Sequence, residues 1–168
     1  MKKERPSNIS DLDQLVFVVK DIEKAAGFFE KVLGTEPFRY FDINFTEEMS
    51  RSLTRGKAAP GRIRKAIARK GQVIFNLNEL VEGETLFKEY ADARGEGLHS
   101  LAFYVDDLEK EVSRLEQEGV KVLHSGTTRS TGLFAFIGGE GCGGVNIRLL
   151  ERSGTSLEER LTGLEKES

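Results

Sequence analysis

Two stretches of this chain carry the same order of residues. Residues 14–24 read QLVFVVKDIEK and residues 100–110 read SLAFYVDDLEK, so Leu, Phe, Val, Asp, Glu and Lys recur at matching positions. In each copy an apolar strand pattern is followed by an Asp that can cap a helix and by the start of an amphipathic helix. The repeat predicts two similar modules in one domain, and it allows equivalent positions in the two halves to be compared.

The composition narrows the classes of protein to which the chain can belong. Its 168 residues suffice for one domain, and a charged fraction of 32% with a hydrophobic fraction of 38% is typical of a soluble globular protein. A net charge of −3 gives no reason to expect nucleic acid, and no apolar run resembles a secretion signal or a membrane span. The single cysteine, Cys142, cannot form an internal disulfide, so we expect a cytoplasmic setting.

Strand and helix patterns predict the order β-α-β-β-β in each half. In the first half Asp21 is expected to cap a helix that ends at Gly34, and Lys70-Gly71 is expected to turn a hairpin. Residues 46–61 are polar and basic and contain Pro60-Gly61, so we expect a loop with a helical turn near residues 47–53. The predicted strands are residues 13–19, 38–45, 62–69, 72–78, 98–105, 120–124, 133–137 and 145–150.

Two helices and a tail complete the second half. Residues 85–93 are expected to form a linking helix and residues 108–118 the second repeat helix. In the tail, Ser156 and Glu159 form a capping-box pattern before an apolar stripe of leucines that can dock on the body or on a second subunit. The predicted segments are an arm (1–10), a first module (11–82), a linker helix (83–96), a second module (97–152) and a C-terminal amphipathic helix or tail (153–168).

The paired modules resemble the vicinal oxygen chelate superfamily, which includes glyoxalase I, extradiol dioxygenases, bleomycin-resistance proteins and methylmalonyl-CoA epimerase. Two segments resemble the epimerase-like branch most closely. They are GETLFKEYADARGEGLHSLAFYVDDLEKEVSRLEQEGVKVL at 83–123 and GGVNIRLLE at 143–151. The resemblance implies an α+β fold in which two βαβββ modules form a cupped mixed sheet with helices on its outer face. Fold alone does not settle the reaction.

The resemblance also implies four metal-binding positions inside the cup, on the first and fourth strands of each module. Members of the superfamily usually place His, Glu or Gln, His and Glu there. In this chain the matching positions, which we call the slot residues, are Gln14, Asn76, Ser100 and Arg148. Neutral amides and a hydroxyl are poor ligands for transition metals, and a guanidinium repels a cation. We therefore expect no metal and no other cofactor at this position.

Three further residues invite a functional interpretation. His99 precedes the slot residue Ser100, so strand alternation predicts that it faces away from the cup with Leu101 and Phe103. His124 ends a predicted strand, before Ser-Gly, and is expected to be an ordinary surface residue. Cys142 lies in the turn GGEGCGG without an aligned His–Asp partner, which argues against a nucleophile.

Strand alternation predicts a half-polar inner surface for the cup. Its many amides and one guanidinium need partners. They can satisfy one another in a closed network, with an acid such as Glu79, or they can face a ligand whose carboxylate, carbonyl or phosphate is held by Arg148. The expected ligand-binding residues are Gln14, Asn76, Asn78, Ser100, Tyr104, Asn146 and Arg148.

A basic stretch offers a second candidate site. Cations between residues 51 and 70 can meet the phosphates of a CoA thioester near the mouth of the cup, or they can form a solvated face. Glu47 and Glu48, in the preceding loop, are candidate general bases. The stretch consists of Arg51, Arg55, Lys57, Arg62, Arg64, Lys65, Arg69 and Lys70.

Three functions remain open from the sequence. The first is a metal-independent isomerase or lyase in which Arg148, a candidate catalytic residue, stabilises an enolate together with Asn76 and Gln14. The second is a binding or sequestering protein of the bleomycin-resistance type. The third is a metal-dependent lyase or isomerase, which requires a different alignment of the ligand positions. In each case we expect a homodimer that binds a small molecule and neither nucleic acid nor membrane.

Overall fold

The computed structural model describes residues 9–45, 49–54, 57–58, 60–129 and 132–167, with side chains for residues 9–45, 60–129 and 132–163. The first module contains β1 (Gln14–Val19), α1 (Ile22–Leu33), β2 (Arg39–Asn44), β5 (Gly61–Lys70) and β6 (Val73–Gly83). Between β2 and β5 the chain forms β3 (Met49–Thr54) and β4 (Lys57–Ala58). The predicted loop over residues 46–61 is therefore wrong, and the predicted helical turn falls partly on residues 46–48, outside the described residues.

The second module repeats the first. It contains β7 (Gly97–Val105), α4 (Leu108–Gln117), β8 (Val122–Thr128), β9 (Gly132–Ile137), the short 3₁₀ helix η1 (Glu140–Cys142) and β10 (Asn146–Glu151). Helix α3 (Leu86–Arg94) links the modules, and α5 (Leu157–Glu167) follows the last strand. The predicted capping box is present, because the Glu159 N–H donates to Ser156 Oγ and the Ser156 N–H donates to Glu159 Oε2.

The two repeat sequences fold in the same way. Asp21 Oδ1 accepts a hydrogen bond from the Lys24 N–H at 2.9 Å, and Asp107 Oδ1 accepts one from the Lys110 N–H at 2.9 Å. Gly34 ends α1 in the left-handed conformation, with φ of 60°, as its place after the apolar stripe predicts. The repeat therefore sets both the strand and the start of the helix in each module.

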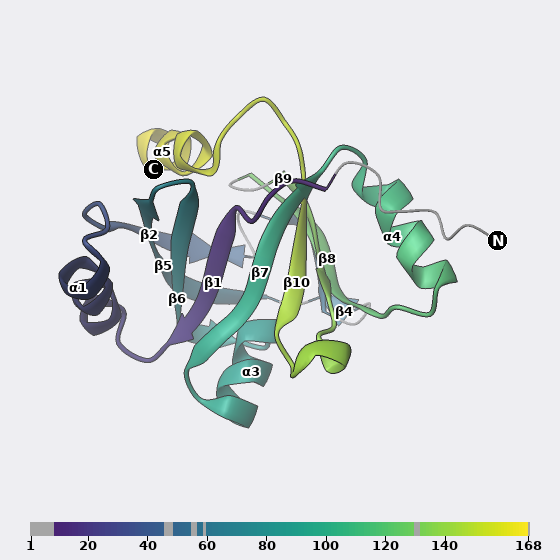
Figure 1. The fold of residues 1–168 in the computed structure, drawn as a ribbon, viewed down its shortest axis with the longest axis horizontal. Coiled ribbons are helices and arrows are strands. Elements are labelled where there is room, and N and C mark those ends of the chain that lie inside the picture. Colours follow the sequence, from purple (N-terminus) through teal and green to yellow (C-terminus); the bar gives the residue numbers. More distant parts are fainter. Residues whose placement is uncertain (1–8, 46–48, 55–56, 59, 130–131, 168) are drawn as a thin grey trace.

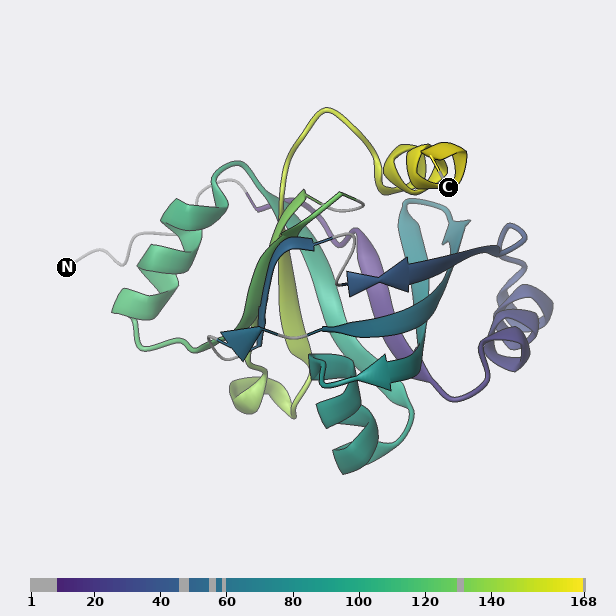
Figure 2. The ribbon, with the colours of Figure 1, turned by 180° about the vertical axis from the view of Figure 1, so that it is seen from behind.

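All strands join one mixed sheet in the order β2-β5-β6-β1-β7-β10-β9-β8-β3-β4. The modules meet where β1 pairs antiparallel with β7. Strand β1 also pairs parallel with β6, and β10 pairs parallel with β7. The sheet curls into a cup, with β1, β7 and β10 on one side in Figure 1 and β2 and β3 brought forward in Figure 2. The α+β cupped fold expected from the resemblance is confirmed.

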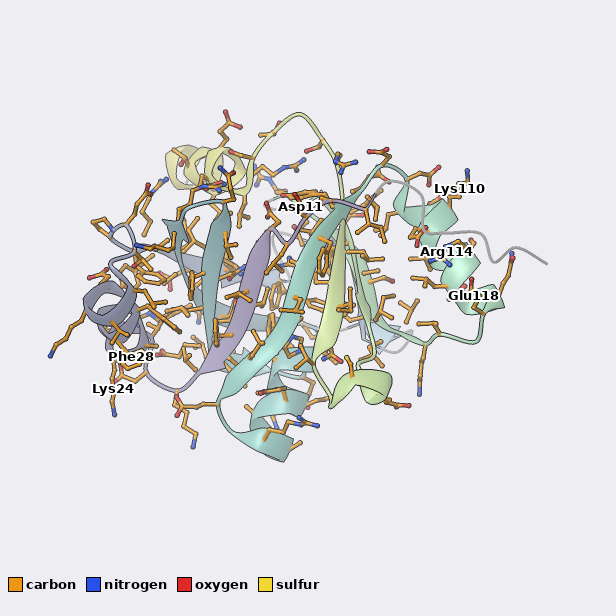
Figure 3. All side chains as sticks on the ribbon, in the orientation of Figure 1. Asp11, Lys24, Phe28, Lys110, Arg114 and Glu118 are labelled. Carbon is orange, nitrogen blue, oxygen red and sulfur yellow. The ribbon has the colours of Figure 1, made fainter. Side chains whose placement is uncertain are left out.

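Three apolar clusters organise the layers around the sheet. The outer face of the first module packs on α1 and the outer face of the second packs on α4. Lys24 and Phe28 on α1, and Lys110 on α4, point away from the sheet (Figure 3). The third cluster fills the cup itself, and α3 and α5 close its two ends with Leu86, Phe87, Leu157 and Leu161 (Figure 1). Within the described residues, no helix is long and apolar enough to cross a membrane.

Candidate anion site in the cup

The slot residues lie on four central strands and face the interior of the cup. Gln14 pairs with Ala102 across β1 and β7, and Arg148 pairs with Ala102 across β10 and β7. Gln14, Asn76 and Ser100 are 0% exposed and Arg148 is 6% exposed. Alternation along each strand thus puts all four residues on the buried inner face.

Lys65 organises the amides of this face. Its Nζ donates to Asn76 Oδ1 at 2.9 Å and to Asn78 Oδ1 at 2.7 Å. Because an ammonium has donors only, Asn76 must turn its oxygen toward Lys65, and its Nδ2 then donates to Gln14 Oε1 at 2.9 Å. This chain of bonds leaves Gln14 Nε2 facing away from the network, where it has no hydrogen-bond partner.

Lys65 is a residue that the sequence interpretation misplaced. The sequence pattern groups it with a basic stretch that is solvated or binds phosphate. In the structure the Lys65 residue is 5% exposed and lines the cup. The signal for this was present, since Lys65 alternates in phase with the buried Ile63 and Ile67 along β5. Glu79, suggested as a partner for the amides, lies elsewhere: its Oε2 accepts a hydrogen bond from the Ile22 N–H at the start of α1.

Arg148 stands apart from the amide network. Its guanidinium lies over the rings of Phe134 and Phe136, at 5.7 Å and 5.3 Å from their centroids. Its Nε and Nη1 have no hydrogen-bond acceptor. Burial lowers the pKa of Arg148 to about 10, with the nearby Tyr104 and Asp13 opposing the change, so the side chain remains a cation at neutral pH.

Asp13 is the carboxylate whose charge raises the pKa of Arg148, but the described residues contain no ion pair between the two. Burial raises the pKa of Asp13, while the neighbouring Gln14 amide and Arg69 lower it. Asp13 Oδ2 and Gln14 Nε2 nevertheless both lack a hydrogen-bond partner. Arg148 therefore has only long-range compensation for its charge.

His99 packs its ring against Phe87 and Phe136, which belong to the cluster that fills the cup, so the predicted outward orientation is wrong. The pairing of β1 with β7 shifts between Val16, which opposes Ser100, and Phe17, which opposes Leu98. This bulge leaves His99 without a partner residue and interrupts the strict alternation that the prediction assumed. His99 Nδ1 lies 3.1 Å from Ser100 Oγ, and burial and Arg148 lower the pKa of the imidazole to about 3.

His124 is buried as well, and the prediction of a surface residue is wrong. It is 5% exposed, and its ring lies 5.4 Å from that of Phe134. The register of the β8–β9 pair shifts between Val122 and His124, and this irregularity accompanies the inward orientation of the His124 side chain. Burial and Arg148 lower the pKa of His124 to about 4. The cup therefore contains two neutral imidazoles near the cations Arg148 and Lys65.

The remaining predicted ligand residues occupy separate surroundings. Asn78 Nδ2 donates to the Phe17 carbonyl and to Asn76 Oδ1, so it belongs to the amide network. Asn146 Oδ1 accepts a hydrogen bond from the Gly139 N–H and holds the glycine-rich turn. Tyr104 lines a different pocket beneath α5. Cys142 is exposed, and its Sγ lies 3.2 Å from the Val145 carbonyl oxygen.

A small cavity of about 30 Å³ adjoins Arg148. Besides Arg148, its polar side chains are Lys65, Thr85, His124 and Thr128, and the rest of the lining is apolar. A cavity of this size holds a water molecule or little more. We call it the Arg148 cavity; it is lined by Ile43, Phe45, Ile63, Lys65, Thr85, Leu86, Phe87, His124, Thr128, Phe134, Phe136 and Arg148.

The residues of the cup do not fit the divalent metal that the superfamily implies. Asn76 Oδ1 and Gln14 Oε1 already accept hydrogen bonds from Lys65 and Asn76, and Arg148 and Lys65 bring two positive charges. Zinc and the other transition metals favour imidazole, thiolate and carboxylate ligands, and a hard cation would still need carboxylates to balance these two positive charges. Within the described part of the chain, no three His, Cys, Asp or Glu side chains lie together as a metal site would require.

The basic stretch is largely engaged in ion pairs where it is described. Arg64 pairs with Glu23, and Arg69 Nε lies 2.5 Å from Glu158 Oε1. Arg62 Nη1 lies 3.6 Å from Glu82 Oε1 on the surface. The side chains of Arg51, Arg55 and Lys57, and residues Glu47 and Glu48, lie outside the described residues.

Comparison with known proteins gives the family. The model of the Glyoxalase/Bleomycin resistance protein/Dioxygenase superfamily matches residues 13–136. The 4-hydroxyphenylpyruvate dioxygenase of Pseudomonas aeruginosa is 30% identical over 121 residues, which are 70% of this chain and 30% of that protein. The chain thus spans less than a third of the length of this curated relative.

Solved structures show the same fold at low identity. Methylmalonyl-CoA epimerase from Mycobacterium tuberculosis superposes with a TM-score of 0.66 at 22% identity, over 90% of this chain and 94% of that one. A Streptomyces coelicolor methylmalonyl-CoA epimerase variant in complex with 2-nitronate-propionyl-CoA gives 0.65 at 20%, over 87% and 99%. A 4-hydroxymandelate synthase variant from the same organism gives 0.60 at 22%, over 84% and 38%. The chain therefore belongs to the glyoxalase, bleomycin-resistance and dioxygenase superfamily, the vicinal oxygen chelate proteins.

Proposed function

We propose that this chain is a metal-independent member of the superfamily that binds a small carboxylate- or carbonyl-bearing molecule in the cup. The observation that carries the proposal is Arg148, a buried cation whose Nε and Nη1 have no acceptor. Buried donors in proteins nearly always have partners, so an unpaired guanidinium favours a ligand that supplies the missing oxygens. A carboxylate suits this role because it matches the planar fork of an arginine.

The surroundings of Arg148 favour an anion over a cation. Lys65 adds a second positive charge to the same cavity, and the amide network leaves a donor, Gln14 Nε2, on the same cross-strand row as Arg148. The walls are rings and aliphatic side chains, which exclude water and strengthen a charged hydrogen bond. An acyl thioester is one candidate ligand, since a related epimerase is known in complex with 2-nitronate-propionyl-CoA.

Calorimetric titration tests the proposal with acetate, pyruvate and propionyl-CoA at constant ionic strength. We expect binding by the wild type and a loss of about 10-fold or more in Arg148→Met, the magnitude of a charged hydrogen bond. Arg62→Met, which removes an exposed guanidinium from β5, is the matched control and should bind like the wild type. Equal binding by Arg148→Met and the wild type would refute the role of Arg148. Stoichiometric zinc that is lost on substitution of Gln14 or Asn76 would refute metal independence.

A second candidate function is proton transfer next to a carbonyl group, as in an isomerase or epimerase. The observation that favours it is His124, a neutral imidazole that lines the Arg148 cavity. Such a group can accept the proton while Arg148 stabilises the enolate oxygen. Exchange of the α-hydrogen of propionyl-CoA in deuterium oxide, lost in both His124→Gln and Arg148→Met, would support catalysis. Binding without exchange would leave a sequestering protein.

A further inference from the structure

We propose that the space between helix α3 and the glycine-rich turn is a second binding site, for a small neutral alcohol with a ring-sized apolar body. This space, which we call the α3 pocket, has a volume of about 210 Å³ and is lined by α3, by His99 and by residues of the turn 138–144. Helix α3 and the turn lie side by side below β7 and β10 (Figure 1). Among the described lining residues, Leu86 alone also lines the Arg148 cavity, so the proposal does not depend on the ligand of Arg148.

His99 supplies the buried polar group of the α3 pocket. The residue is 0% exposed, and its Nε2 has no hydrogen-bond partner among the described residues. Its Nδ1 lies 3.1 Å from Ser100 Oγ, so Nε2 is the ring nitrogen that remains for a ligand. Buried nitrogen atoms in proteins nearly always have a partner. The unpaired Nε2 of a residue that lines a pocket therefore points to a molecule that binds there.

Three aromatic rings hold the imidazole of His99 in place. The centroids of Phe87, Tyr90 and Phe136 lie 5.0, 5.4 and 5.2 Å from that of the imidazole. Tyr90 is itself fixed, because its hydroxyl donates to the Leu98 carbonyl oxygen at 3.2 Å. A ligand therefore meets a nitrogen that is already oriented, and little free energy is lost in ordering the ring on binding.

The opposite wall of the pocket is backbone, and it is tied to α3. A Cβ added at Gly139 would clash with the carbonyl of Val145, and a Cβ added at Gly144, where φ is 87°, would clash with the guanidinium of Arg94. Arg94 Nη1 donates to the Gly143 carbonyl oxygen at 3.3 Å. The glycines thus allow the turn to approach the helix closely, and the contact with Arg94 sets the shape of the pocket between them.

The chemistry of His99 favours a hydroxyl group on the ligand. Burial and the nearby Arg148 lower the pKa of the imidazole to about 3, so His99 is neutral and attracts no anion by charge. In a neutral imidazole Nε2 is a donor or an acceptor, depending on which way the hydrogen bond with Ser100 runs. A hydroxyl group both donates and accepts, so it satisfies Nε2 in either tautomer.

The remaining lining favours an uncharged, apolar body. Leu86 and Leu123 are buried residues of the pocket. Glu89, Arg94 and Glu140 line it as exposed residues, so charges of both signs lie at its edge and select neither an anion nor a cation. Because an apolar cavity of about 150 Å³ is enough for benzene, a pocket of about 210 Å³ can hold one six-membered ring with a short substituent.

Amide chemical-shift titration with benzyl alcohol tests the location of the site. We expect the largest shifts at Gly139 and Gly144 in the turn and at Ala93 on α3. Ala93→Trp, at an exposed position that lines the pocket, should abolish them. Asp92→Trp, at an exposed position of the same helix outside the lining, is the matched control and should bind like the wild type. No binding, shifts confined to the Arg148 cavity, or binding that survives in Ala93→Trp would overturn the proposal.

The role of His99 is tested by comparing benzyl alcohol with ethylbenzene, which has the same shape but a methyl group in place of the hydroxyl. His99→Phe keeps a ring and removes the nitrogen, so the ratio of the two dissociation constants should shift by about 5-fold toward ethylbenzene, the magnitude of one hydrogen bond. His99→Gln carries an amide that can donate and accept, and it should restore most of the wild-type ratio. A ratio that is the same in the wild type and in His99→Phe would overturn the role of His99. The amide spectrum of each variant shows that it is folded.

Discussion

The two buried histidines make a strong prediction about pH and stability. They are the only histidines of the sequence, and burial beside Arg148 lowers their pKa values to about 3 and about 4. Unfolding returns each imidazole to a pKa near 6.5. Below that pH the unfolded chain binds more protons than the folded one, so stability must fall as the pH is lowered.

The size of this effect follows from the same values. Between pH 7.5 and pH 5.5 each histidine should cost about 1.4 kcal/mol, and the pair about 3 kcal/mol, in the free energy of unfolding. Urea denaturation followed by circular dichroism at both pH values measures it, since the chain has no tryptophan for fluorescence. His99→Gln and His124→Gln should each remove about half of the pH dependence.

Comparison with these variants isolates the imidazoles from other groups. Asp13 acts in the opposite direction, because a carboxyl whose pKa is raised in the folded state stabilises the protein at low pH and loses that contribution as the pH rises. An unfolding free energy that is the same at pH 7.5 and pH 5.5 in the wild type and in both histidine variants would refute the buried, neutral state of His99 and His124.

Three further predictions concern caps, packing and charge. Asp21→Ala and Asp107→Ala should each destabilise the protein by about 1 kcal/mol in urea denaturation, since the two caps have the same geometry; a large difference between them would contradict equivalent modules. Leu161→Ala should cost about 2–5 kcal/mol in urea denaturation, because Leu161 is 0% exposed within the cluster that fills the cup; a loss below about 1 kcal/mol would contradict this packing. Asp13→Asn should strengthen acetate binding severalfold in calorimetry, because it removes a negative charge near Arg148; weaker binding would contradict an anion site.

Local patterns predicted most of the fold. The repeat, the caps at Asp21 and Asp107 and the alternation along β1, β6 and β10 depend on neighbouring residues, so the sequence shows them directly. The segment around β3 was missed because its strand character comes from pairing with β8, which lies far away in the chain. Its polar composition gave no sign of that partner.

Local alternation also predicted part of the candidate site, and long-range pairing explains the part that it missed. Gln14, Asn76 and Arg148 face the cup because they alternate with buried apolar residues. His99 was placed on the wrong face because a bulge in β7 changes the phase of alternation, and a bulge depends on both strands of a pair. Lys65 was missed because its charge argued for the surface, although its phase along β5 argued for the interior.

The stability of Arg148→Met, measured together with its acetate binding, tests most directly whether Arg148 is buried for a ligand. A buried guanidinium without an acceptor costs free energy, so its replacement by an apolar side chain of similar length should raise the free energy of unfolding by about 1–4 kcal/mol. The account predicts a variant that is more stable than the wild type and no longer binds acetate. A variant that is destabilised by several kcal/mol, or that binds acetate as before, would show that Arg148 has a structural role instead.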